Sequence, residues 1–128
     1  SDARASFSNY GRTVPVYAPG VSIYSAFNGG GYGNGGDGTS YSSPLVAGLA
    51  GIVKSFHSSW TPRQVALQIK TTCDSIDGVN PSLAGNLGRG RVNFARALSE
   101  SHAGIEINSA LVRTPGGRTL FLPNDTIV

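Results

Sequence analysis

The order of apolar and polar residues first predicts two short strands followed by a helix. Val14–Ala18 is a short apolar run that a Pro-Gly pair closes, and Val21–Phe27 alternates apolar with small polar residues, so we expect both to be strands. Leu45–Val53 has no polar face, and a helix that is apolar all round is a buried one. We expect Pro44 in the first turn of this helix, where a missing backbone N–H does no harm, and the helix end near residues 54–57.

The next part of the chain predicts two more helices separated by a loop. Thr61-Pro62-Arg63-Gln64 has the form of a capping box, with threonine before the helix, proline at its first position and glutamine at its third. Apolar residues follow at helical spacing, so we expect an amphipathic helix over 62–73. Residues 74–88 are rich in Asp, Asn, Gly and Pro and predict a loop, and Val92–Leu98 predicts a third, short helix. The apolar face of the second helix consists of Val65, Ala66, Ile69 and Cys73.

After His102 the chain changes character and predicts strands. Ile105–Ile107, Leu111–Arg113 and Thr119–Leu122 are short runs of strand-forming residues, and a turn sequence at 114–118 separates the last two. We therefore expect two units: residues 1–102 as part of one domain, and residues 103–128 as a hairpin-like tail or the start of an appended domain.

A glycine-rich run lies between the second predicted strand and the first helix. Asn28–Gly38 holds seven glycines in eleven positions, so it is either a mobile loop or a segment whose backbone passes close to something. Gly31-x-Gly33-x-x-Gly36 fits a dinucleotide-binding pattern, but no acidic residue follows about 20 positions later to hold a ribose. The stretch Gly33–Ser40 nearly fits a phosphate-binding loop but has threonine in place of the required lysine. Nucleotide binding is therefore not expected.

The composition argues against a disordered protein and against a membrane-spanning one. With 39% hydrophobic and 13% charged residues, the 128-residue chain is not typical of disorder, and no apolar run approaches the ~18 residues that span a bilayer. No basic-then-apolar signal segment opens the chain. From Val14 to Val53 the one charged residue is Asp37, which is typical of the interior of a large fold. The lone Cys73 predicts a buried, inert thiol.

The net charge of +3 does not favour a nucleic-acid partner. Arg89, Arg91 and Arg96 lie within eight residues and could contact phosphate, but a solvated loop and helix edge explains them better. We expect neither a nucleic acid nor a membrane as a partner.

Candidate chemistry lies at Gly38-Thr39-Ser40, directly before the first helix. A serine there is surrounded by backbone N–H groups that have no intrahelical partner, at the positive end of the helix dipole. An anion that forms beside Ser40 would be stabilised by those donors, including the Ser40 N–H, which suits acyl transfer with Ser40 Oγ as the attacking atom. The alternative is that Thr39 or Ser40 is an ordinary N-cap.

The stretch from Gly38 to Gly48, GTSYSSPLVAG, resembles the serine motif of the subtilisin-like serine proteases, written G-T-S-x-[AS]-x-P-x-V-A-G. Arg4–Gly11, Val16–Ile23 and Gly88–Asn93 resemble further segments of that family, so the resemblance covers residues 3 to 98. Two positions depart from the family pattern: Tyr41 stands where many members have Met, and Leu45 where many have His. The motif positions that match are Gly38, Thr39, Ser40, Ser42, Pro44, Val46, Ala47 and Gly48.

The resemblance implies an α/β fold, namely the C-terminal portion of a three-layer α/β/α domain with a mostly parallel sheet, followed by a short β-rich tail. It implies that residues 1–102 belong to the catalytic domain of a secreted serine endopeptidase. It assigns the nucleophile to Ser40 and places the Ser40 backbone N–H, Thr39 and Gly38 at the oxyanion and substrate-binding site. Calcium is common in the family, but the sequence indicates no ligand for it.

The sequence does not contain an evident base for Ser40. The family order of Asp, His and Ser places both partners, and an oxyanion Asn, before the serine, yet residues 1–39 contain no histidine. His57 would lie roughly 25 Å from Ser40 if one helix joins them, and His102 is expected at the surface. Asp2 and Asp37 do not lie in the family's Asp motif.

We therefore expect an N-terminal portion of the same protease, carrying the Asp and the His, as the partner, and a peptide or protein as the substrate. The chain alone should be inactive. The alternative is a non-catalytic subtilisin-like module that binds peptide or a partner protein.

Overall fold

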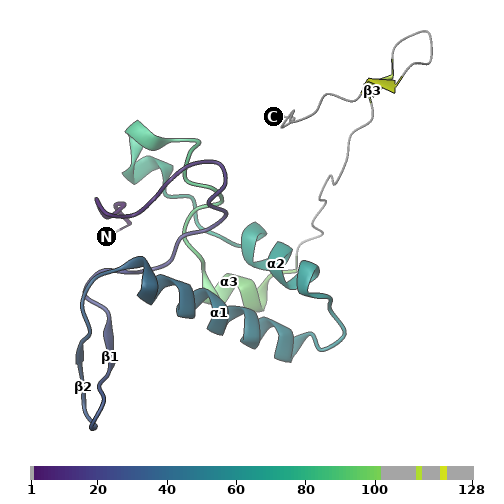
Figure 1. Ribbon diagram of the computed structural model, residues 1–128. Helices are drawn as coiled ribbons and strands as arrows, with labels where there is room; N and C mark the ends of the chain where they lie inside the picture. The colour runs from purple at the N-terminus through teal and green to yellow at the C-terminus, as the bar shows by residue number, and fades with distance from the viewer. Residues whose placement is uncertain (1, 102–111, 114–118, 121–128) are drawn as a thin grey trace.

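The computed structural model describes residues 2–101, 112–113 and 119–120. A hairpin of two strands extends from the N-terminal end of the long helix α1, and α2 and α3 lie beside α1 (Figure 1). In chain order the elements are β1 (Tyr24–Ala26), β2 (Tyr32–Asn34), α1 (Thr39–Phe56), α2 (Pro62–Thr71), the 3₁₀ helices η1 (Asp77–Val79) and η2 (Pro81–Leu83), α3 (Phe94–Ser99), β3 (Val112–Arg113) and β4 (Thr119–Leu120).

Helix α1 begins earlier than the apolar run predicts. Its N-cap is Gly38, which has no side chain to cap the helix, and the helix ends at Phe56, as expected. The expectation that Pro44 lies in the first turn is wrong: Pro44 is the sixth residue of the helix, in its second turn. Because proline has no N–H, the carbonyl of Ser40 lacks its usual partner four residues later. The helix continues past Pro44 to Phe56 with the loss of this one backbone bond.

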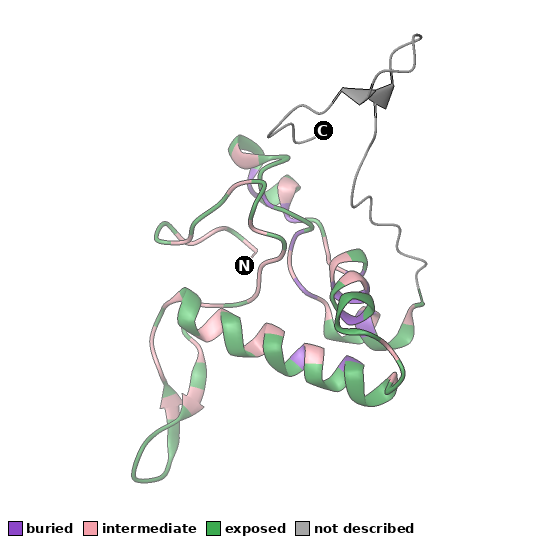
Figure 2. Cartoon of the chain, turned by 45° about the vertical axis from the view of Figure 1, so that its right-hand side comes forward, coloured by how far each residue is buried: buried purple, intermediate pink, exposed green. Residues whose placement is uncertain are grey.

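The expectation that α1 is buried on all sides is wrong for this structure. Leu49 and Val53 are the buried residues of α1, while Ile52, at the edge of the exposed face, is 39% exposed. Figure 2 shows the same pattern, with most of α1 coloured as exposed. The physical reason is that α2 and α3 cover one side of the helix. The exposed face consists of Pro44, Ala47, Gly48, Gly51, Ile52 and Ser55, at the 3- and 4-residue spacing of one helix face.

The capping box of α2 forms as predicted. The Thr61 side chain accepts the backbone N–H of Gln64, and the Gln64 side chain accepts the backbone N–H of Thr61. The helix ends at Thr71, two residues before the predicted end. Of the four predicted apolar-face residues, two are buried, Cys73 is half-buried and Ala66 is exposed. The hydrophobic core is Leu49, Val53, Val65, Ile69, Val92 and Ala97.

The predicted strand Val14–Ala18 is reduced to one bridge. Tyr17 pairs with Arg91 in parallel: the Tyr17 N–H donates to Gly90 O at 2.8 Å, and Val92 N–H donates to Tyr17 O at 2.8 Å. On its other side, Arg91 forms an antiparallel bridge with Asp74. Gly90 fits here because its φ is +94° and a Cβ would collide with the Asp74 carbonyl oxygen. Three chain segments are thus aligned side by side as in a sheet.

The glycine-rich run forms one arm of a hairpin. β1 and β2 pair antiparallel, with Ser25 opposite Gly33, so the predicted strand over Val21–Phe27 is confirmed in its central residues. The alternative of a close backbone approach is also confirmed, because a Cβ on Gly33 would lie 2.6 Å from the Phe27 ring.

The remaining predictions concern the loop, the third helix and the tail. The loop over 74–88 contains the two short 3₁₀ helices, and α3 starts at Phe94, two residues later than predicted, with Asn93 as its N-cap. In the tail, β3 pairs antiparallel with β4, as the predicted hairpin requires. The predicted strand Ile105–Ile107 lies outside the described residues.

Candidate functional site

Ser40 is the second residue of α1, and it is exposed. Among the described residues its hydroxyl makes no hydrogen bond, so it does not act as the N-cap that the alternative interpretation proposed. The helix has 18 residues and no acidic residue in its first turn. The unpaired N–H groups and the positive end of the helix dipole therefore face solvent beside a free hydroxyl. This arrangement can stabilise an anion that forms next to Ser40.

The residue before the helix, Gly38, is held by the segment that follows Pro19. Gly38 N–H donates to Gly20 O at 2.7 Å, and Tyr41 N–H donates to Gly38 O at 3.1 Å. A Cβ on Gly20 would lie 2.5 Å from Ser42 Oγ and 2.9 Å from Gly38 O, so only glycine allows this approach. The start of α1 is therefore fixed by backbone contacts.

Asp37 makes a structural contact with the segment after Gly20. Its Oδ1 accepts the backbone N–H of Ser22 at 2.7 Å, and Ser22 has a φ of +54°, which is uncommon for a residue with a side chain. Asp37 thus stabilises an unusual turn opposite the helix start rather than capping the helix itself. Sequence reasoning did not identify Gly20 or Ser22 as part of the site, although the Pro-Gly turn was a signal for it.

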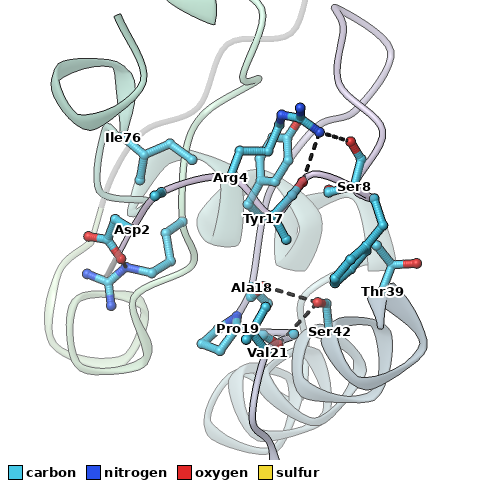
Figure 3. Close-up of a pocket in the computed structure, with 15 residues that line it drawn as sticks. Asp2, Arg4, Ser8, Tyr17, Ala18, Pro19, Val21, Thr39, Ser42 and Ile76 are labelled. Carbon is cyan, nitrogen blue, oxygen red and sulfur yellow. Dashed lines mark hydrogen bonds and ion pairs between the residues drawn. The ribbon is translucent and has the colours of Figure 1, made fainter. Parts of the chain in front are cut away.

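Ser42 faces a different direction from Ser40. Its hydroxyl donates to Ala18 O at 3.0 Å or Pro19 O at 3.1 Å, toward a depression of about 360 Å³ that Figure 3 shows. Thr39 also lines this depression, whereas Ser40 lines neither of the two main depressions of the described surface. Ser42 therefore joins α1 to the segment 18–20, and Ser40 is left free.

The candidate bases do not reach Ser40. The helix between Ser40 and His57 is continuous, so its rise separates them by roughly 25 Å. The His57 ring instead stacks on Trp60, with ring centroids 3.8 Å apart. Asp2 pairs with Arg91 at 3.1 Å. His102 lies outside the described residues, so its predicted surface position remains a prediction.

Cys73 is an unreactive thiol rather than a second nucleophile. It is half-buried, and burial, assisted by the negative charge of Asp74, raises the pKa of its thiol to about 11. Its Sγ lies 3.1 Å from Ile69 O, as a donor to that carbonyl. Cys73 is less buried than the sequence predicts, and its raised pKa supports the prediction of an inert thiol.

Two of the three clustered arginines are engaged within the protein. Arg91 and Arg96 both contact Asp74, at 2.8 and 3.2 Å, and Arg96 also pairs with Glu100 at 2.8 Å. Arg89 is exposed. These ion pairs join the end of α2 to α3. They give Arg91 and Arg96 a structural role at a loop and a helix edge, without a phosphate partner.

Within the described part of the chain, no three His, Cys, Asp or Glu side chains cluster so that they could hold a metal ion. The same residues include no helix that is both long and apolar enough to cross a membrane.

A free hydroxyl at the start of a long helix, within a Gly-Thr-Ser motif, is the type of site from which a serine hydrolase attacks. Comparison with known proteins identifies the family. The model of the Subtilase family, Peptidase_S8, matches residues 1–97. The chain belongs to the subtilase family of serine proteases, and this membership implies an α/β fold. The resemblance found in the sequence is thereby confirmed.

Several subtilisins are similar to the chain over part of their length. Subtilisin NAT from Bacillus subtilis subsp. natto is 47% identical over 72 residues, which are 56% of this chain and 19% of that protein. The thermostable alkaline protease of Halalkalibacterium halodurans is 42% identical over 94 residues, 73% of this chain and 24% of that protein. Subtilisin Savinase from Lederbergia lenta is 40% identical over 77 residues, 60% of this chain and 28% of that protein. The chain therefore spans less than a third of each of these relatives.

Proposed function

We propose that this chain contributes the nucleophile Ser40 to a serine endopeptidase. The Asp and the His of its triad belong to a portion of the protease outside these 128 residues. The observation that carries the proposal is the position of Ser40: exposed, free of hydrogen bonds among the described residues, and second in an 18-residue helix. An N-cap or packing role would use the hydroxyl within the chain, and Ser40 does not.

The chemistry follows from that position. The histidine of the other portion takes the proton of Ser40 Oγ as Oγ bonds to the carbonyl carbon of the substrate. The resulting oxyanion accepts the N–H of Ser40, with Gly38 and Thr39 beside it. The C–N bond then breaks, the amine leaves with the proton from histidine, and water releases the acyl group by the reverse sequence. The missing base explains why we expect the chain alone to be inactive.

The finer fold is part of the same proposal. We infer that the bridges between Tyr17, Arg91 and Asp74 belong to the mostly parallel sheet of a three-layer α/β/α domain. The parallel bond pattern between residues 15–17 and 89–92 supports this inference. We also propose that the whole protein is secreted. We assign no calcium ligand among the described residues.

The test is peptide hydrolysis by the whole protease with single serines replaced. We expect Ser40→Ala to reduce hydrolysis to the background rate, because Ser40 Oγ is the attacking atom of the proposed reaction. Ser43→Ala is the matched control, since Ser43 is exposed on the same helix, and we expect it to retain most of the activity. Retained activity in Ser40→Ala would refute the proposal. A wild-type protein that binds peptide without cleaving it would favour the non-catalytic alternative.

A further inference from the structure

The residue directly after Ser40 ties the start of α1 to the glycine-rich segment before it. Tyr41 is half-buried, and its hydroxyl donates a hydrogen bond to the carbonyl oxygen of Gly35. Gly35 N–H in turn donates to Ile23 O at 2.7 Å, at the base of the β1–β2 hairpin. The segment from Gly35 to Tyr41 is thus closed into a loop by one side chain, and Ser40 lies inside that loop.

The glycines of this segment fit the Tyr41 ring. A Cβ on Gly35 would lie 3.2 Å from the Tyr41 ring carbon Cε1 and would collide with Ser25 Oγ. A Cβ on Gly36 or Gly38 would also touch the tyrosine, at 3.7 and 3.8 Å. Glycine is costly to order, so a segment with this many glycines needs an external contact to hold one path. In addition to the Gly38–Gly20 backbone bond and the contact of Asp37 with Ser22, Tyr41 supplies such a contact from the first turn of α1.

We propose that Tyr41 is a positioning residue for Ser40. By holding Gly35–Gly38 against the helix start, it fixes the direction of the first N–H groups of α1 and of the Ser40 hydroxyl. Donors that stabilise a developing oxyanion are effective only when they are already oriented before the reaction. Methionine, which many family members carry here, cannot donate such a bond, so this contact depends on the tyrosine. This inference rests on the proposed function of Ser40.

The test compares two tyrosine-to-phenylalanine variants in the whole protease. Tyr41→Phe keeps the ring and removes the hydroxyl. Tyr24→Phe is the matched control, because the Tyr24 hydroxyl also donates to a backbone carbonyl, that of Tyr32, but in the exposed part of the hairpin. We expect Tyr41→Phe to slow the acylation of Ser40 by a fluorophosphonate about three- to tenfold, while the inhibitor's dissociation constant changes less than about twofold. Tyr24→Phe should leave both constants unchanged.

A second measurement requires no catalysis. We expect hydrogen exchange of the backbone amides of residues 35–39 to speed up in Tyr41→Phe and not in Tyr24→Phe. Unchanged exchange, or acylation of Tyr41→Phe at the wild-type rate, would overturn the inference while leaving the role of Ser40 intact. An equal loss in both variants would also overturn it. If the wild-type protein is not acylated at Ser40, the proposed function fails, and the positioning role fails with it.

Discussion

Ser40 and Cys73 differ in the surroundings that decide whether a side chain can act as a nucleophile. Ser40 is exposed at the positive end of a long helix, where an anion is stabilised. Cys73 is half-buried beside the carboxylate of Asp74, and both burial and that charge raise the pKa of its thiol. With a pKa of about 11, the thiolate is roughly one part in ten thousand at pH 7. The surroundings of Cys73 thus argue against it as a nucleophile, and those of Ser40 support the role proposed for it.

The lowered pKa of Asp74 predicts how the free energy of unfolding depends on pH. A hydrogen bond from the Asn93 side chain at 2.9 Å, supported by Arg96 and Arg91, lowers the pKa of this carboxyl below its ordinary value. A carboxyl whose pKa is lower in the folded state contributes stability above about pH 4, and that stability is lost as the pH falls through the folded-state pKa. We therefore expect the free energy of unfolding of the wild type to fall steeply below about pH 4, and that of Asp74→Asn to be lower at pH 7 but less dependent on pH.

Urea unfolding of the whole protein at several pH values measures this effect. Asp77→Asn controls for the loss of one acidic residue, because the Asp77 carboxylate accepts the Gly85 N–H, away from the arginines. If the free energy of unfolding changes with pH equally in the wild type and in Asp74→Asn between pH 5 and about pH 2.5, the contacts of Asp74 do not act in this way.

At the residue scale, the sequence pointed to a candidate site but not to the contacts around it. Ser40 and its motif were identified because the residue types and spacing are specific. The bond from Tyr41 to Gly35 was not, because nothing in a linear pattern shows that a side chain turns back six positions along a glycine-rich loop. The backbone contact of Gly20 with Gly38 was missed for the same reason.

At the scale of elements, local signals succeeded where the interaction is local. The capping box of α2 forms as predicted because its two bonds involve residues three positions apart. Pro44 was placed in the wrong turn because the polar residues Thr39–Ser43 hid the true start of α1. The strand over Val14–Ala18 was overestimated because strand length depends on partners from distant segments, and only Arg91 pairs with it among the described residues.

The two sides of α1 give a prediction at this scale. Leu49 is fully buried against α2 and α3, so Leu49→Ala should lower the free energy of unfolding by about 2–5 kcal/mol. Ile52 lies on the exposed face and is the matched position. If a further part of the protease covers that face, Ile52→Ala should cost about 2 kcal/mol or more in the whole protein, measured by urea unfolding. A cost below about 0.5 kcal/mol would show that the face is open to solvent.

At the scale of the whole molecule, the described residues carry exposed apolar surface, including Ile52 and Phe56 of α1. The stretch from Val14 to Val53, with Asp37 as its one charged residue, predicted an interior, yet Leu49 and Val53 are its buried members among the described residues. The prediction assumed that every covering element lies within the chain. Because the chain spans 19% to 28% of the relatives described above, most of the contacts that such a fold makes lie outside it. The same reasoning supports the proposal that the base for Ser40 lies outside the chain.

The most direct measurement of the central claim is covalent labelling with a fluorophosphonate, with the modified residue located by peptide mass mapping. We predict that the chain together with the portion that carries the Asp and the His is labelled at Ser40. We predict that the chain alone, and the assembled Ser40→Ala variant, are not labelled. Labelling of the chain alone at the rate of the assembly, or labelling of the assembly at another serine, would contradict the account.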